Sequence, residues 1–67
     1  MDLDELTDKD IAILQLMADG YTTKEIASKK KMSIRTIETY IYRITQKTEA
    51  KKVWLLIIEL YKKSILH

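Results

Sequence analysis

The sequence contains no cysteine and no proline, and it has one glycine and one histidine. Without cysteine, neither a disulfide framework nor a thiolate zinc site can support a small core. The one histidine, His67, is the last residue, so we expect no metal site and no other cofactor. The longest apolar run, residues 53–58, is far shorter than the roughly 20 residues that cross a bilayer. No basic and then apolar leader opens the chain, and we therefore expect a cytoplasmic protein without membrane contact.

What is present fits a single small domain over residues 1–67. The composition is 46% hydrophobic and 33% charged, a balance typical of folded rather than disordered chains. A chain of 67 residues buries a modest core, so its stability is expected to be marginal on its own. Since disulfides and thiolate metal sites are excluded, oligomerisation is the remaining support.

The charges are divided unevenly along the chain. Residues 1–20 carry a net charge of −5, whereas residues 21–67 carry +7. A basic face attracts phosphate groups, which makes nucleic acid a candidate partner. The alternative is a solvated, lysine-rich surface without a ligand.

The helix starts share one pattern of capping residues. Thr7 with Asp10, and Thr22 with Glu25, match the capping box, and Ser33 is a third N-cap. No alternating β-type run is present, so the fold class is predicted to be all-α with four helices. The predicted helices cover about 8–19, 23–30, 34–47 and 50–66.

The third helix has the clearest periodicity. Its apolar stripe consists of Ile34, Ile37, Ile41 and Ile44. The opposite face carries side chains that form directional hydrogen bonds with bases and phosphates: Arg35, Thr36, Thr39, Tyr42, Arg43 and Gln46, with Glu38 on the flank.

The fourth helix is apolar on two sides. One stripe, suited to the domain's own core, consists of Val53, Leu56, Ile57 and Leu60. The second stripe consists of Trp54, Ile58, Tyr61 and Ile65. A small domain needs only one such face, so the second stripe is predicted to be the interface of a homodimer.

Four short segments, in their order and spacing, resemble the LuxR-type (GerE-like) DNA-binding domain. They are "LTDKDIAILQLMADG", "KEIASK", "SIRTI" and "ITQK". The resemblance covers nearly the whole chain and implies a four-helix domain with a helix-turn-helix. It also implies sequence-specific binding of double-stranded DNA by a transcriptional regulator or its output domain. Residues 33–47 would then be the recognition helix in the major groove.

The resemblance and the polar face of the third helix together define the candidate site. The residues expected to contact bases are Arg35, Glu38, Thr39, Tyr42 and Arg43. The residues expected to contact the DNA backbone are Thr23, Lys24, Lys29, Lys30, Lys31, Thr36, Gln46 and Lys47. The three lysines of the turn are a hypothesis of their own, because the family has leucine and then glycine where this chain has Lys30 and Lys31. A left-handed Lys31 would be strained by roughly 1 kcal/mol, which phosphate binding could offset.

Two alternatives share the same architecture. One is a protein-interaction module that uses the fourth helix, and the other is a promoter-binding module like region four of sigma factors. Catalysis is not expected: the only acidic cluster is Asp2, Asp4, Asp8 and Asp10, with no histidine or cysteine nearby. Carboxylates are structurally favourable at a helix N-terminus, and no small-molecule site is visible.

Overall fold

The computed structural model describes residues 2–67, and within them it contains four α-helices and no β-strand. The helices are α1 (Asp8–Ala18), α2 (Thr23–Lys30), α3 (Ile34–Thr48) and α4 (Val53–Lys62). The all-α, four-helix fold predicted from the sequence is confirmed. None of the helices in the described range has the length and apolar character needed to cross a membrane.

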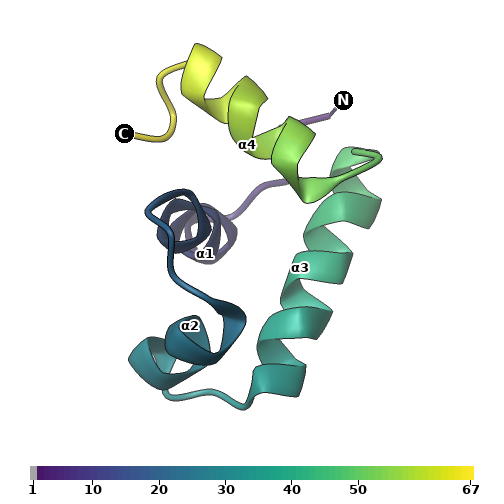
Figure 1. The fold of residues 1–67 in the computed structure, drawn as a ribbon. Coiled ribbons are helices and arrows are strands. Elements are labelled where there is room, and N and C mark those ends of the chain that lie inside the picture. Colours follow the sequence, from purple (N-terminus) through teal and green to yellow (C-terminus); the bar gives the residue numbers. More distant parts are fainter. Residues whose placement is uncertain (1) are drawn as a thin grey trace.

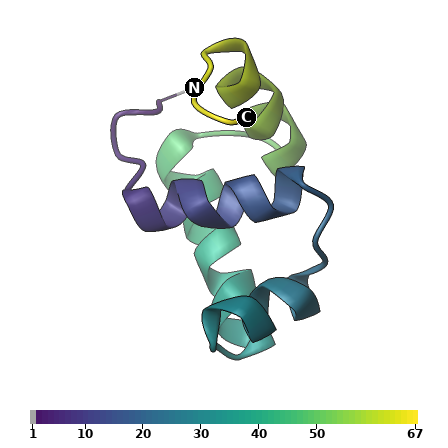
Figure 2. The ribbon, with the colours of Figure 1, turned by 90° about the vertical axis from the view of Figure 1, so that its left-hand side faces the viewer.

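The longest helix, α3, forms one side of the molecule, and the other helices pack along its length (Figure 1). α2 lies beside the start of α3, and α4 crosses near its end. α1 lies between α2 and α4 and crosses α3, as the view turned by 90° shows (Figure 2). The three residues 31–33 join α2 to α3, so these two helices form a helix-turn-helix.

Side chains cap the first three helices as predicted. Thr7 Oγ1 accepts from the Asp10 N–H at 3.1 Å, and the Thr7 N–H donates to the Asp10 carboxylate at 3.0 Å. Thr22 and Glu25 make the same reciprocal pair at the start of α2. Ser33 Oγ accepts from the Thr36 N–H at 3.1 Å. Both capping boxes and the serine cap are therefore confirmed.

Left-handed backbone ends or follows several helices. Gly20, after α1, has φ 97°, and Lys31, directly after α2, has φ 56°. The left-handed conformation considered for Lys31 from the sequence is confirmed, and Gly20, which lacks a Cβ atom, adopts it without strain. Glu49 (φ 58°) and Ser64 (φ 60°) repeat this geometry after α3 and α4 without glycine.

The fourth helix is shorter at both ends than the predicted range 50–66. Left-handed Glu49 ends α3, and the Ala50 N–H then donates to the Thr45 carbonyl at 3.1 Å, so the chain turns before α4 begins at Val53. At the other end, Ser64 reverses the chain, and the Ile65 N–H donates to the Leu60 carbonyl at 2.9 Å.

The reversed C-terminal segment packs back onto the domain. Leu66 is buried, and its neighbour His67 exchanges two 3.0 Å hydrogen bonds with the side-chain amide of Gln15 on α1. The N-terminal segment is also attached, since the Asp2 N–H donates to the Thr48 carbonyl at 2.9 Å.

The core consists of two clusters that meet at α1. The first cluster lies between α1, α3 and α4, and its buried residues are Leu14, Ile44, Leu56, Ile57, Leu60 and Leu66. The second lies between α1, α2 and α3, and its buried residues are Ile13, Ile26, Ala27 and Ile37. Consecutive residues of α1, Ile13 and Leu14, therefore serve different clusters.

The predicted isoleucine stripe of α3 holds for three of its four members. Ile37 and Ile44 are fully buried, and Ile41 is partly buried against the second cluster. Ile34 is 45% exposed, contrary to the prediction. It is the first residue of α3 and lies about one turn before the first buried isoleucine, so it extends past the end of the core.

Candidate nucleic-acid interface

The face of α3 opposite the core is open to solvent along its length. All five residues predicted to contact bases lie in α3 and are exposed: Arg35, Glu38, Thr39, Tyr42 and Arg43. Among the exposed large hydrophobic residues of 2–67, Tyr42 is the most open, with 64% of its surface exposed. The two core clusters hold the opposite side of the helix, so the orientation of this face is fixed by packing.

The charged side chains of this face lack partners in the part of the chain that the structure describes. Within residues 2–67, no hydrogen bond or ion pair involves the side chains of Arg35, Glu38 or Arg43. Beside them, a shallow hollow of about 300 Å³ is lined by Ser33, Arg35, Thr36, Thr39, Tyr40 and Arg43. This lining combines two guanidinium groups with hydroxyl groups and contains no carboxylate, which suits a ligand with negative charge and hydrogen-bond acceptors.

The residues predicted to contact the DNA backbone are distributed over α2, the turn and α3. Lys24, Lys29, Lys31, Thr36 and Gln46 are exposed, whereas Thr23, Lys30 and Lys47 are partly buried. The turn brings the three lysines to the start of α3, at the lower end of the molecule in Figure 1.

Two of these side chains have contacts within the domain near the turn. The Lys29 ammonium lies 4.6 Å from the centre of the Tyr21 ring, a cation–π contact that orients it. The Thr36 hydroxyl is paired with the Ser33 hydroxyl at 2.8 Å. Lys24, Lys31 and Gln46 make no side-chain contact of this kind in the described residues.

Lys47 forms an ion pair with Asp10, which sequence reasoning missed. Asp10 is only 3% exposed and links the N-terminus of α1 to the end of α3. Burial raises the pKa of Asp10, but the hydrogen bonds from Lys47 and Thr7 outweigh that effect and lower the pKa below its ordinary value. Asp10 was identified only as a capping residue, and no pattern in the sequence indicated its second partner.

The exposed apolar surface of α4 differs in part from the predicted stripe. Trp54, Ile58 and Tyr61 are exposed as expected, and Trp54 has 61% of its surface open. Leu55 is also exposed and was missed. Ile65 does not belong to this surface, because the reversed C-terminal segment places it against the first core cluster.

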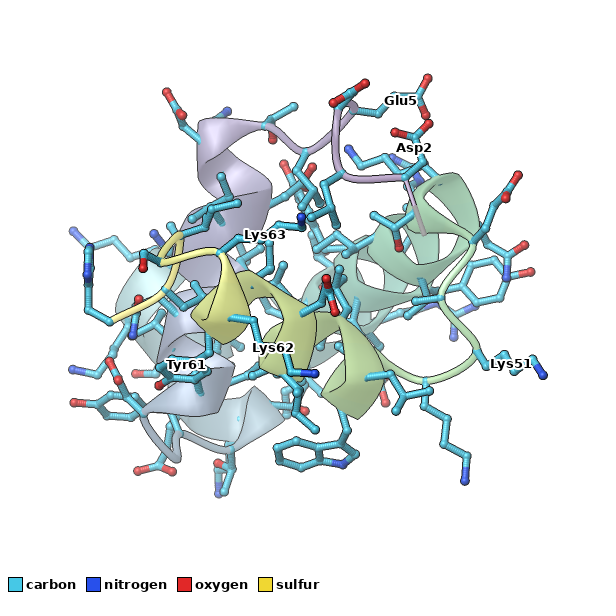
Figure 3. All side chains as sticks on the ribbon, turned by 90° about the horizontal axis from the view of Figure 1, so that it is seen from above. Asp2, Glu5, Lys51, Tyr61, Lys62 and Lys63 are labelled. Atoms are coloured by element: carbon cyan, nitrogen blue, oxygen red, sulfur yellow. The ribbon has the colours of Figure 1, made fainter. Side chains whose placement is uncertain are left out.

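Basic residues lie near both ends of this apolar surface of α4. Figure 3 looks down on the helix and shows Tyr61 with Lys62 and Lys63 near one end and Lys51 near the other. We refer below to Trp54, Leu55, Ile58 and Tyr61 together as the α4 patch.

Comparison with known proteins places almost the whole chain in one family of sequences. The family model described as "Bacterial regulatory proteins, luxR family" matches residues 4–65. The chain is 40% identical over 62 residues to the "Probable transcriptional regulator ycf29" of Porphyra purpurea, an alignment that covers 92% of this chain and 30% of that protein.

Two bacterial proteins also match. Identity is 44% over 46 residues with the "Transcriptional regulatory protein DesR" of Bacillus subtilis, which covers 69% of this chain and 23% of that protein. Identity is 39% over 46 residues with the "Response regulator protein VraR" of Staphylococcus aureus, an alignment that covers 69% of this chain and 22% of that protein. The chain thus spans less than a third of the length of these relatives. No solved structure matches.

Proposed function

The chain belongs to the luxR family of bacterial regulatory proteins, and on this premise we propose that it is the DNA-binding module of a transcriptional regulator. The observation that carries the proposal is the face of α3, whose arginines and carboxylate are exposed and have no partner within residues 2–67. The family is one of regulatory proteins, which is not an enzyme class, and the match favours this reading over a module like sigma-factor region four.

In the proposed complex α3 lies in the major groove. Its 15 residues make a rod of about 22 Å, long enough to follow the groove across one half-site. The guanidinium groups of Arg35 and Arg43 can donate to O6 and N7 of guanine, and the Glu38 carboxylate can accept from the amino group of cytosine. Thr39 and Tyr42 add hydroxyl groups and apolar surface on the same face.

The DNA backbone would pass over the start of α2 and the lysine turn. Thr23 and Lys24 lie at the N-terminus of α2, where free backbone N–H groups favour a phosphate. Lys29, Lys30 and Lys31 place three further cations near the start of α3. Lys47 would reach phosphate only while sharing its ammonium with Asp10.

Fluorescence anisotropy with a labelled duplex, after selection of bound sequences from a random pool, tests the proposal. Arg43→Ala should weaken specific binding by about 1–3 kcal/mol, which is roughly 5- to 150-fold. Lys62→Ala removes a cation from α4 and serves as the matched control, with affinity expected within about twofold. Equal affinities for the wild type and Arg43→Ala would contradict the assignment of α3 as the reading helix.

The α4 patch supports a second part of the proposal, a homodimer. A second copy of the same chain would cover the patch, and closed two-fold dimers are the commonest homo-oligomers. The small size of the domain adds a reason, since association would stabilise its limited core. A two-fold dimer would present two reading helices, and the selected DNA should contain a two-fold repeated motif.

Sedimentation equilibrium tests the dimer. Trp54→Glu should shift the chain to monomer, because a carboxylate would be buried in the apolar contact. Tyr42→Glu is the matched control, since Tyr42 is an aromatic of similar exposure on α3 and lies outside the patch. An unchanged mass distribution for Trp54→Glu would exclude the α4 patch as the contact.

In a longer regulator the input signal would reach this module from elsewhere in the protein, as the short coverage of the relatives suggests. We propose that the module acts in the cytoplasm.

A further inference from the structure

Ile34 is an apolar side chain on a polar surface. In residues 2–67 the large aliphatic side chains that are strongly exposed are Ile34, Leu55 and Ile58. The latter two belong to the α4 patch, which leaves Ile34 as the exposed aliphatic residue of the reading helix. Ile34 lies past the end of the second core cluster, in which Ile37, about one turn later, is the first buried isoleucine of α3, so its exposed surface is free for an external partner.

The position of Ile34 aligns it with two residues of the candidate interface. Residues spaced by four lie in a row along one side of a helix, so Ile34, Glu38 and Tyr42 form one such row. All three are exposed, and Ile34 stands at the N-terminal end of the row. In helix-turn-helix proteins the N-terminal residues of the recognition helix contact base edges.

The chemistry of the groove offers one partner for an aliphatic side chain. The C5-methyl group of thymine is the apolar group that bases present in the major groove, and side chains without polar atoms pack against it. The side chain of Ile34 has no hydrogen-bond donor or acceptor, so it cannot bind a phosphate or a polar base edge. The carboxylate of Glu38, one turn away, accepts from an amino group of a base. The row therefore contains one side chain for an apolar base contact and one for a polar base contact.

The geometry points to Ile34 as a specificity-determining residue that packs against the methyl group of a thymine in the half-site. This inference rests on the proposed DNA-binding function and adds to it a required base at one position. Contact with the methyl group also predicts a neighbouring cytosine within reach of Glu38. Ile34 therefore reads sequence, although it lacks the hydrogen-bonding groups by which such residues are usually recognised.

Replacement of thymine by deoxyuridine tests the contact, because deoxyuridine pairs in the same way but lacks the methyl group. Each thymine of the selected half-site is replaced in turn, and affinity is measured by anisotropy with the full chain. For the wild type, one replacement should weaken binding by about fourfold, the value expected for one buried methyl group. For Ile34→Ala the same replacement should have no effect.

Thr39→Ser is the discriminating variant, since Thr39 is the one residue among the five predicted base contacts that carries a methyl group able to contact thymine. The deoxyuridine effect should persist in Thr39→Ser. Thermal unfolding should change only modestly for Ile34→Ala, because nearly half of the residue is exposed and the better helix propensity of alanine offsets part of the lost contact.

The outcomes separate the two levels of the proposal. If the wild type binds a selected duplex but no thymine shows a methyl effect, or the effect persists in Ile34→Ala, the inference is overturned and DNA binding stands. Loss of the effect in Thr39→Ser but not in Ile34→Ala would assign the methyl contact to Thr39 and overturn it too. Failure of the wild type to bind any duplex would overturn the proposed function and this inference together.

Discussion

Lys31 shows at the level of one residue that the fold accepts a local cost. Its left-handed backbone (φ 56°) is a conformation that favours glycine. The side chain itself is exposed and makes no ion pair in the described part of the chain. The left-handed backbone lets the N–H groups of Lys31 and Met32 donate to the last carbonyls of α2, which offsets part of the strain. The ammonium group has no such partner in the described residues, and an external phosphate is the partner that the proposal supplies.

Lys31→Gly should stabilise the domain by about 0.5–1 kcal/mol, because it removes the strain at the cost of some backbone entropy. Urea unfolding monitored by circular dichroism measures this change. Lys30→Gly is the matched control: Lys30 is the last residue of α2 and has helical backbone, so glycine there relieves no strain and should destabilise the domain by up to about 1 kcal/mol. If Lys31→Gly weakens DNA binding while it raises the free energy of unfolding, the lysine is retained for DNA binding and not for stability.

The Asp10–Lys47 pair makes a prediction about pH. The folded pKa of Asp10 lies below its unfolded value of about 3.9, so the pair contributes its full stability above that pH. The contribution is lost as the pH falls through the folded pKa. Asp10→Asn should therefore cost about 2 kcal/mol of unfolding free energy at pH 7 and much less near pH 3, where Asp10 becomes protonated. The cost at pH 7 is modest because Lys47 is partly exposed and its charge is screened.

Urea unfolding of Asp10→Asn across this pH range provides the measurement. Glu59→Gln is the control, because Glu59 and Lys63 form a wider pair on the surface, at 4.0 Å, that should contribute little. A cost for Asp10→Asn that does not vary between pH 7 and pH 3 would show that the ionised pair is not its source.

At the scale of the elements, the sequence predicted most where short-range chemistry decides. Thr7, Thr22 and Ser33 begin helices because their hydroxyl groups accept nearby N–H groups, and such contacts are visible within four residues. Gly20 is likewise a local signal. These residues allowed the four-helix fold and the helix-turn-helix to be predicted.

The features that the sequence did not predict correctly all depend on contacts between residues that are far apart in the chain. Ile65 and Leu66 continue a helical pattern in the sequence, yet α4 ends at Lys62, and left-handed Ser64 turns the chain back onto the first core cluster. The pairing of Asp10 with Lys47 and the exposure of Ile34 depend equally on how α1 and α2 meet α3. Spacing within one helix carries no information about where a neighbouring helix ends.

Leu66 provides a test of the reversed segment. Leu66→Ala should destabilise the domain by about 2–4 kcal/mol, because the side chain is buried in the first core cluster. Ile65→Ala is the matched control and should cost less, since Ile65 is only partly buried. Chemical denaturation compares the two variants, and equal small effects would show that the segment is detached in solution.

At the scale of the whole molecule, the two proposed surfaces lie at different ends. The lysine turn is at the end of the molecule occupied by α2, and the α4 patch is at the opposite end (Figure 1). The basic residues of 21–67 thus fall into two groups, one on α2, the turn and α3 and the other around α4. Only the first group should affect the ionic-strength dependence of DNA binding.

Replacement of Lys29, Lys30 and Lys31 by glutamine should reduce the slope of log affinity against log salt concentration. The reduction should be about 0.9 for each lysine that neutralises a phosphate. Replacement of Lys51, Lys62 and Lys63 by glutamine removes the same charge near α4 and is the control (Figure 3). Equal slopes for the two triple variants would show that the turn lysines are ordinary surface residues.

The neighbouring positions of Ile13 and Leu14 have a consequence for cooperativity. Each belongs to a different apolar cluster, and a single helical turn of α1 supplies both. Loosening that turn would release the support of the reading helix and of α4 in the same event. Amide hydrogen exchange should accordingly give α3 and α4 one shared opening free energy, so that neither surface can be lost by partial unfolding while the other survives.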